Sequence, residues 1–279
     1  MRLILTKGSD EVGWVPRLRT RRGHEPYAIL SHRWHNDPNS ELLFADLEDI
    51  DESGSGTIKN LQYMAADTRS KSAFYKVQSA ASRALADGYD YIWIDTCCID
   101  KTSSAELSEA INSMFTWYSA SEICYVYLAD CEVHNLQNER AKARFASSEW
   151  WQRGWTLQEL IAPRNLVFFS LDWVEIGRKR DLDLAAEISK ITRIDVNVLN
   201  DTIPLDSVSV AQRMSWAANR ITSRIEDIAY SLMGIFAVDM PLLYGEGDCH
   251  DRFSTTRCKL RKHRHLTVRY GKPTISRTA

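Results

Sequence analysis

The chain has 279 residues, of which 44% are hydrophobic and 26% charged, and its formal net charge is -2. A chain of this length buries roughly 75% of the surface that its unfolded form exposes, so it does not need disulfides to fold. No apolar run approaches the ~20 residues of a membrane-spanning helix, and the first residues lack the features of a signal peptide. We therefore expect a cytoplasmic globular protein whose six cysteines are reduced.

The charge is unevenly distributed along the chain. Residues 252–279 contain nine Lys or Arg and no Asp or Glu, which leaves 26 basic against 37 acidic side chains in the rest. A basic tail can contact nucleic acid or anionic lipid. The same residues show no apolar periodicity, which favours a solvated, poorly ordered terminus. We therefore predict a separate tail at 251–279 and do not expect nucleic acid as a partner.

Short apolar runs and helical patterns alternate in the first part of the chain. Apolar spacing predicts a helix over 74–85 that ends near Gly88, and a capping box opens a second helix at Ser103. A short helix is predicted at 156–162. Strands are predicted at 27–31, 91–95, 123–128 and 166–169. Because neighbouring parallel strands need crossover connections, this alternation indicates an α/β fold with an open, mostly parallel sheet and flanking helices.

The remaining segments divide the chain further. Residues 46–60 are acidic and then rich in Ser and Gly, as in an exposed loop. From residue 181 the pattern becomes helical, and apolar residues at 225–236 share one face of a predicted helix. We predict a domain at 1–180, a helical extension packed on it at 181–250, and then the basic tail.

Polar side chains follow the first two predicted strands. Ligands in an open parallel sheet bind beyond the carboxyl ends of the strands, so these side chains are candidates for a nucleotide site. Arginine would bind phosphate, tryptophan would stack, and aspartate would bind ribose hydroxyls. The candidates are Ser31, His32, Arg33, Trp34, Asp95 and Asp100. The alternatives are that Asp95 and Asp100 cap local turns and that His32 is a structural histidine.

A second candidate segment is rich in aromatic and charged residues. Glu159 lies near Arg153 and Trp155 and could act as a general base or bind a ribose. The alternative is a surface ion pair with Arg153, worth about 0–1 kcal/mol, and spacing alone favours it. Cys131 and His134 have the spacing of metal ligands, but no second pair completes a zinc site, so we predict no metal and no required cofactor.

Three blocks of the sequence stand out as motifs, namely Tyr27–Trp34, Tyr91–Lys101 and Arg153–Leu160. They resemble the motifs of the fungal heterokaryon-incompatibility (HET) domain family, and the core motifs together fall within 27–169. Three later stretches, 212–218, 224–230 and 240–247, resemble the region that follows the domain in many fungal members. The chain departs from the family pattern at His35, where glycine is usual, and after Gly247, where relatives continue with an amphipathic helix.

The HET family is in turn remotely similar to Toll/interleukin-receptor (TIR) domains, which have flavodoxin-like sheets. Some TIR domains cleave NAD with a glutamate in a Trp-Cys-x-x-Glu-Leu segment, and Trp155–Leu160 has this spacing. The resemblance therefore implies that Glu159 is catalytic, that NAD is a substrate, and that Arg153 and Trp155 join the nucleotide-binding residues. Fold similarity alone does not establish function.

Two functions follow from the resemblance. In the first, the chain is an effector that promotes regulated cell death in non-self recognition by hydrolysing NAD or a related nucleotide. In the second, it is a non-catalytic module that transmits the death signal through self-association or a protein partner. The convergence of polar groups on one rim of the sheet favours the first.

Overall fold

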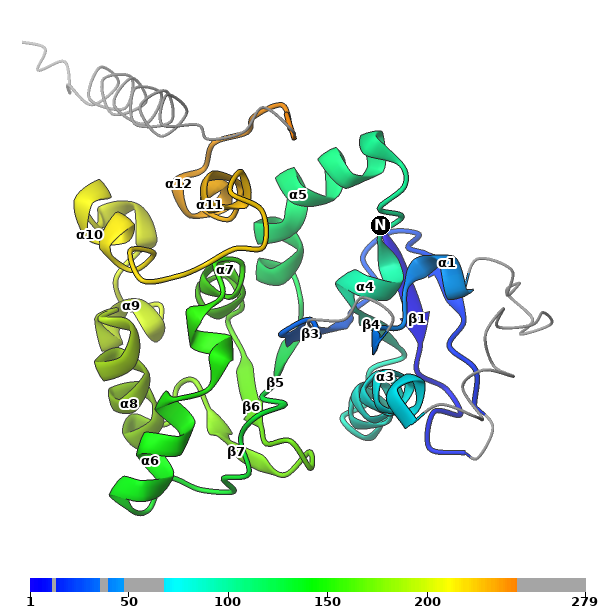
Figure 1. Ribbon diagram of the computed structural model, residues 1–279, viewed down its shortest axis with the longest axis horizontal. Coiled ribbons are helices and arrows are strands. Elements are labelled where there is room, and N and C mark those ends of the chain that lie inside the picture. Colours follow the sequence, from blue (N-terminus) through cyan, green and yellow to red (C-terminus); the bar gives the residue numbers. More distant parts are fainter. Residues whose placement is uncertain (12–13, 36–39, 48–67, 245–279) are drawn as a thin grey trace, which may run out of the picture.

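The computed structural model describes residues 1–11, 14–35, 40–47 and 68–244 (Figure 1). One seven-stranded sheet has the order β2-β1-β4-β3-β5-β6-β7. The strands are β1 (Arg2–Leu5), β2 (Leu18–Thr20), β3 (Ala28–His32), β4 (Tyr91–Trp93), β5 (Ile123–Tyr127), β6 (Leu166–Phe169) and β7 (Glu175–Arg178).

The helices lie between and after these strands. In the first part they are α1 (Phe44–Leu47), α3 (Thr68–Ala86), α4 (Asp95–Cys98), α5 (Ser104–Ser119), α6 (Glu139–Ala146), η2 (Glu149–Gln152) and α7 (Thr156–Ile161). After β7 follow α8 (Leu182–Thr192), α9 (Val196–Leu199), η3 (Leu205–Ser207), α10 (Val210–Ser215), α11 (Asp227–Tyr230) and α12 (Met233–Phe236).

The centre of the sheet is parallel. β3 pairs in parallel with β4 and β5, and β5 pairs in parallel with β6. The four parallel strands thus have the order 2-1-3-4 when numbered along the chain, which is the order of flavodoxin-like sheets. The predicted α/β fold with a mostly parallel sheet and flanking helices is confirmed. The antiparallel strands β1, β2 and β7 at the two edges were not predicted.

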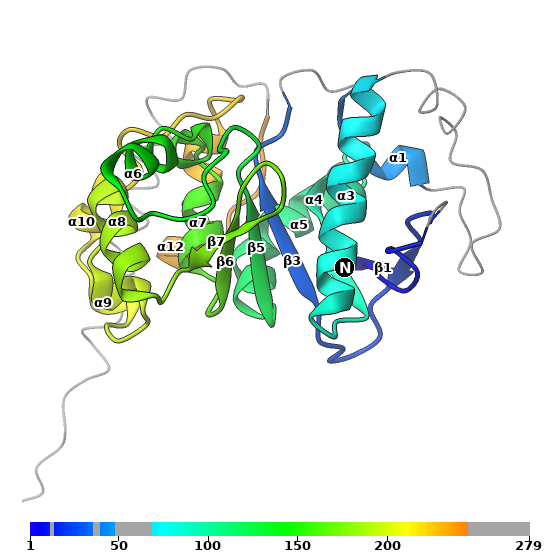
Figure 2. The same ribbon diagram turned by 90° about the horizontal axis from the view of Figure 1, so that it is seen from below.

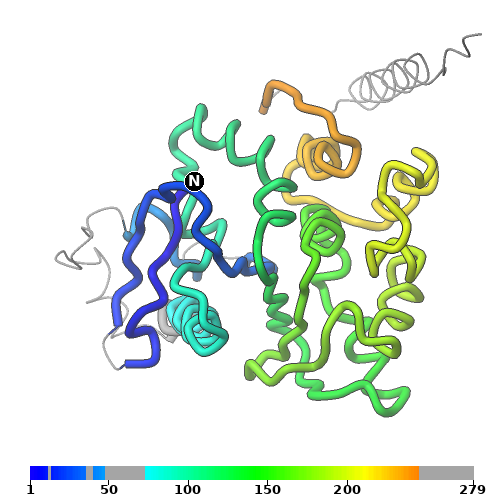
Figure 3. Tube along the Cα trace, turned by 180° about the vertical axis from the view of Figure 1, so that it is seen from behind, coloured from blue at the N-terminus to red at the C-terminus, as the bar shows by residue number. Residues whose placement is uncertain are grey.

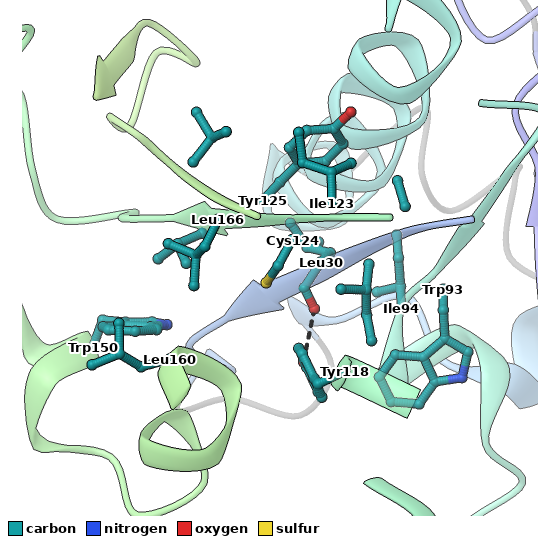
Figure 4. Close-up of a cluster of buried hydrophobic side chains, with 14 of the residues drawn as sticks. Leu30, Trp93, Ile94, Tyr118, Ile123, Cys124, Tyr125, Trp150, Leu160 and Leu166 are labelled. Atoms are coloured by element: carbon teal, nitrogen blue, oxygen red, sulfur yellow. Dashed lines mark hydrogen bonds between the residues drawn. The ribbon is translucent and has the colours of Figure 1, made fainter. Parts of the chain in front are cut away.

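Helices cover both faces of the central strands, which explains why all residues of β3 and β6 are buried. On one face, α3 lies along the strands (Figure 2), and the Tyr125 hydroxyl donates 2.7 Å to Asp87 just beyond it. On the other face, Tyr118 of α5 donates 3.1 Å to the Leu30 carbonyl, and Trp150 and Leu160 lie on the same side (Figure 4). The core is therefore two layers separated by the sheet.

The region after β7 is mainly helical, as predicted, and its end packs on α5 (Figure 3). The single helix predicted over 225–236 is wrong, because the chain forms α11 and α12 with a turn between them. The turn brings Gly234 against α5, where an added Cβ would lie 2.1 Å from Phe115 Cβ. Ile225, assigned to the apolar face, is 47% exposed. Close packing against α5 thus replaces a continuous amphipathic helix.

Other predictions concern the loop, the tail and the cysteines. Asp46 and Leu47 lie in α1, while residues 48–60 of the predicted loop and the basic tail fall outside the described residues. Cys97, Cys98, Cys124 and Cys131 are free and buried. Within the described ranges, no helix combines the length and apolar character needed to cross a membrane.

Candidate functional site

A pocket of about 260 Å³ opens where β3 and β4 end. Its volume is slightly below the roughly 300–1,000 Å³ of typical small-molecule sites. β4 and β5 flank β3 on opposite sides, so the chain reverses its direction across the sheet here, which is where open α/β sheets bind ligands. The lining residues are His32, Trp34, Asp95, Ile99, Lys101, Leu107, Ile111, Met114, Arg153, Trp155, Thr156, Glu159, Ser223, Arg224, Asp227 and Tyr244.

Glu159 is a buried carboxyl group in the wall of this pocket, with 7% of the residue exposed. Its Oε2 accepts a 2.5 Å hydrogen bond from the Ser31 hydroxyl, which itself accepts 2.9 Å from Trp150 Nε1. Burial raises the pKa of Glu159 from 4.5 to about 8, and the Ser31 hydrogen bond opposes this shift. The interpretation of Glu159 as a surface ion pair with Arg153 is therefore wrong.

The amino end of α7 is held by buried hydrogen bonds. The Thr156 hydroxyl donates 2.7 Å to the Trp150 carbonyl. Arg220 Nη1 donates 2.8 Å to both Thr156 Oγ1 and the Arg153 carbonyl. The helix that carries Glu159 is thus tied to the segment that follows α10.

The carboxyl end of α7 is held by a buried lysine. Lys179 is 1% exposed, and its ammonium donates to the carbonyls of Leu160 and Pro163. A cation at this end of a helix is favourable because the last carbonyls have no intrahelical partner. Both ends of α7 are therefore fixed, and so is the position of Glu159.

A second polar group occupies the β3 and β4 side of the pocket. Trp34 Nε1 donates 2.7 Å to Asp95 Oδ2, and the Lys101 ammonium lies 3.3 Å from the centroid of the Trp34 ring. His32 lies between two carboxylates, with Nδ1 3.9 Å from Asp95 and Nε2 3.8 Å from Glu41. Burial lowers the pKa of His32 well below 6.5 and raises that of Asp95, so His32 is neutral.

The structure brings six of the nine candidate residues to the pocket: His32, Trp34, Asp95, Arg153, Trp155 and Glu159. Ser31 is fully buried and contacts Glu159. Arg33 and Asp100 lie outside the lining. Arg33 instead pairs at 2.7 Å with Glu149, and Asp100 accepts hydrogen bonds from the backbone and hydroxyl of Thr102, as expected for a turn-capping aspartate.

Sequence reasoning did not select the wall formed by Ser223, Arg224, Asp227 and Tyr244. These residues lie more than sixty positions after Glu159, and no spacing rule connects them to it. The signal that pointed toward Arg224, Asp227 and Tyr244 was the resemblance of 224–230 and 240–247 to the region following the family's domain.

His134 and Cys131 do not share a site. His134 Nε2 lies 2.8 Å from Asp172, while Cys131 is buried. No cluster of metal-ligating side chains occurs among the residues whose positions are described.

These features define an α/β protein with a pocket where strands of a mostly parallel sheet end. Residues 27–138 match the family described as Heterokaryon incompatibility protein (HET). The chain is also 43% identical over 225 residues to the vegetative incompatibility protein HET-E-1 of Podospora anserina. The chain belongs to the HET family.

The alignment with HET-E-1 covers 80% of this chain and 15% of that protein. The chain thus spans a small part of the curated relative. No solved structure matches the chain. The similarity to TIR domains that the Trp155–Leu160 spacing implies stays a prediction.

Proposed function

We propose that this chain is an effector domain of fungal heterokaryon incompatibility that promotes regulated cell death by hydrolysing NAD or a related nucleotide. Its family and its similarity to a vegetative incompatibility protein support the biological role. The observation that carries the chemical proposal is Glu159, a buried carboxyl in a pocket that also contains two tryptophans, Trp34 and Trp155, and the cation Arg153.

The pocket suits cleavage of an N-glycosidic bond. In the proposed reaction, the bond between ribose C1′ and the nicotinamide nitrogen breaks, its electron pair goes to the nitrogen, and nicotinamide leaves neutral. Water adds its oxygen to C1′ and gives a proton to the Glu159 carboxylate. The transition state has oxocarbenium character, and a carboxylate stabilises such a charge strongly in a pocket of low dielectric.

Binding of a positively charged nicotinamide ring would prepare Glu159 for this role. With a pKa of about 8, the empty pocket holds much of Glu159 protonated at neutral pH. A cation beside a carboxyl group favours the ionised form. Binding of the substrate would thus convert Glu159 to the carboxylate, which then accepts the proton of the attacking water.

The test is nicotinamide release from NAD by the purified protein. We expect Glu159→Gln to abolish release, because the amide neither accepts the proton nor carries a charge. The matched control is Glu132→Gln, which changes an exposed carboxylate away from the pocket and should leave the rate unchanged. Equal rates for wild type and Glu159→Gln would contradict the proposed catalytic role.

Expression in fungal cells separates this proposal from the signalling alternative. If the death signal is transmitted by self-association or a protein partner, Glu159→Gln would kill cells as efficiently as wild type. If NAD hydrolysis causes death, the variant would be harmless while Glu132→Gln would remain toxic.

A further inference from the structure

Arg153 is a half-buried cation in the wall of the pocket. Its Nη1 donates 3.1 Å to the neutral Ser223 hydroxyl, and among the described residues it forms no ion pair. Burial, followed by the nearby charge of Arg33, lowers its pKa. A positive charge in these surroundings gains stability from any anion that enters the pocket.

The backbone around Arg153 is fixed against the segment that follows α10. Gly154 N donates 2.8 Å to the Ile221 carbonyl, and Ile221 N donates 2.7 Å to the Gln152 carbonyl. The approach is so close that an added Cβ on Gly154 would lie 2.5 Å from Thr222 Cγ2. Ser223 and Arg224 follow this contact directly, so their positions relative to Arg153 are built into the fold.

Arg224 adds a second cation to the same wall. Its guanidinium carbon lies 4.7 Å from the centroid of the Tyr244 ring, and its charge acts on the neighbouring Asp227. The carboxylate on this wall, Asp227, accepts a 2.9 Å hydrogen bond from the Tyr244 hydroxyl. Burial raises the pKa of Asp227, and the hydrogen bond from Tyr244 and the charge of Arg224 oppose this shift.

We propose that Arg153, Ser223 and Arg224 form an anion subsite that binds the phosphate of a phosphorylated nucleoside. Guanidinium groups bind phosphate oxygens in a bidentate manner, and a serine hydroxyl adds a further donor. The subsite rests on the proposed function: it would hold the phosphate against residues 223–224 and leave the reacting sugar carbon beside Glu159. The preferred substrates are therefore nucleotides rather than unphosphorylated nucleosides.

Binding of ADP-ribose, measured by titration calorimetry, tests the subsite without requiring turnover. We expect Arg153→Gln and Arg224→Gln each to weaken binding about ten- to a hundredfold, as for loss of a hydrogen bond to a charged group. Arg153→Lys retains the charge but not the planar guanidinium group. Its affinity for ADP-ribose should therefore lie between those of the glutamine variants and that of wild type. Arg164→Gln, at an exposed position outside the pocket, is the matched control.

Substrate selectivity provides the second measurement. In both glutamine variants, kcat/KM for NAD should decrease. Nicotinamide riboside has no phosphate, so kcat/KM for this substrate should change by less than about twofold. Melting temperatures close to wild type show that the variants fold.

The two proposals fail in different ways. A wild-type protein that binds ADP-ribose through Arg153 but releases no nicotinamide would refute the hydrolase and retain the subsite. Unchanged ADP-ribose affinity in both glutamine variants, or no binding of ADP-ribose or pyrophosphate to wild type, would overturn the subsite.

Discussion

Burial and hydrogen bonding shift the pKa of Glu159 in opposite directions, and the effect of burial is the larger one. The hydrogen bond from Ser31 favours the carboxylate, but removal from water favours the acid more strongly. The same feature that makes Glu159 a candidate catalytic group therefore makes it sensitive to pH near neutrality.

The first consequence concerns activity. Hydrolysis as proposed requires the carboxylate form, so kcat/KM for NAD should rise with pH and level off above about 8, the pKa in the free protein. The measurement is nicotinamide release at limiting NAD across buffers from about pH 6 to 9.5. A kcat/KM that falls over this range would instead indicate that the protonated acid is required.

The second consequence concerns stability. Because the pKa of Glu159 rises from 4.5 to about 8 on folding, the folded protein keeps a proton that the unfolded chain releases between these values. The stabilisation is complete below the unfolded pKa and is lost as pH rises through the folded one. The glutamine in Glu159→Gln does not titrate, so the variant does not lose this stabilisation. The melting temperature of the variant minus that of wild type should therefore increase between about pH 5 and about pH 9. A difference that stays constant with pH would contradict the assigned shift.

Among the elements, the parallel strands were readable from the sequence and the edge strands were not. Strands buried on both faces give continuous apolar runs, as at 27–31 and 166–169, and these were predicted. The antiparallel strands β1, β2 and β7 have three or four residues each, and most of their side chains are partly exposed. A segment of three or four residues is too short to show the alternation of apolar and polar residues that distinguishes a strand from a loop.

Helix α7 shows why part of the site was misinterpreted. All six of its residues are buried, including Gln158 and Glu159, because it lies between the sheet and the segment after α10. Helical spacing assumes that a side chain opposite the apolar face meets solvent. At Glu159 a second layer of protein replaces solvent, and the residues of that layer come from a distant part of the sequence.

The contact between α7 and that layer depends on Gly154. In Gly154→Ala the new Cβ would overlap Thr222 Cγ2, and we expect a loss of about 1–3 kcal/mol in the free energy of unfolding. Thr222→Ser removes the methyl group and keeps the hydroxyl that donates to the Arg224 carbonyl. The free energy of unfolding, measured with urea, should therefore be higher in the double variant than in Gly154→Ala. If the effects of the two substitutions are additive, the overlap with Thr222 does not cause the loss.

At the scale of the whole molecule, the pocket is assembled from two regions that the sequence analysis assigned to different units. Residues 1–180 contribute the ends of β3 and β4 and helix α7, and the later region contributes Ser223, Arg224, Asp227 and Tyr244. The HET match itself covers 27–138 and ends before Glu159. The residues that line the pocket thus extend beyond both the family match and the predicted boundary at residue 180.

A chain ending at residue 180 tests this view of the unit. It lacks Arg220, whose guanidinium bridges the Arg153 carbonyl and Thr156, and it exposes the buried residues of α7. We expect it to lose the cooperative thermal transition of the full chain and to be cleaved by protease within α7. Arg220→Met in the 279-residue chain should lower the melting temperature less, since packing by the region after β7 remains. A cooperative transition in the 1–180 chain, together with ADP-ribose binding, would show that the first region forms the site alone.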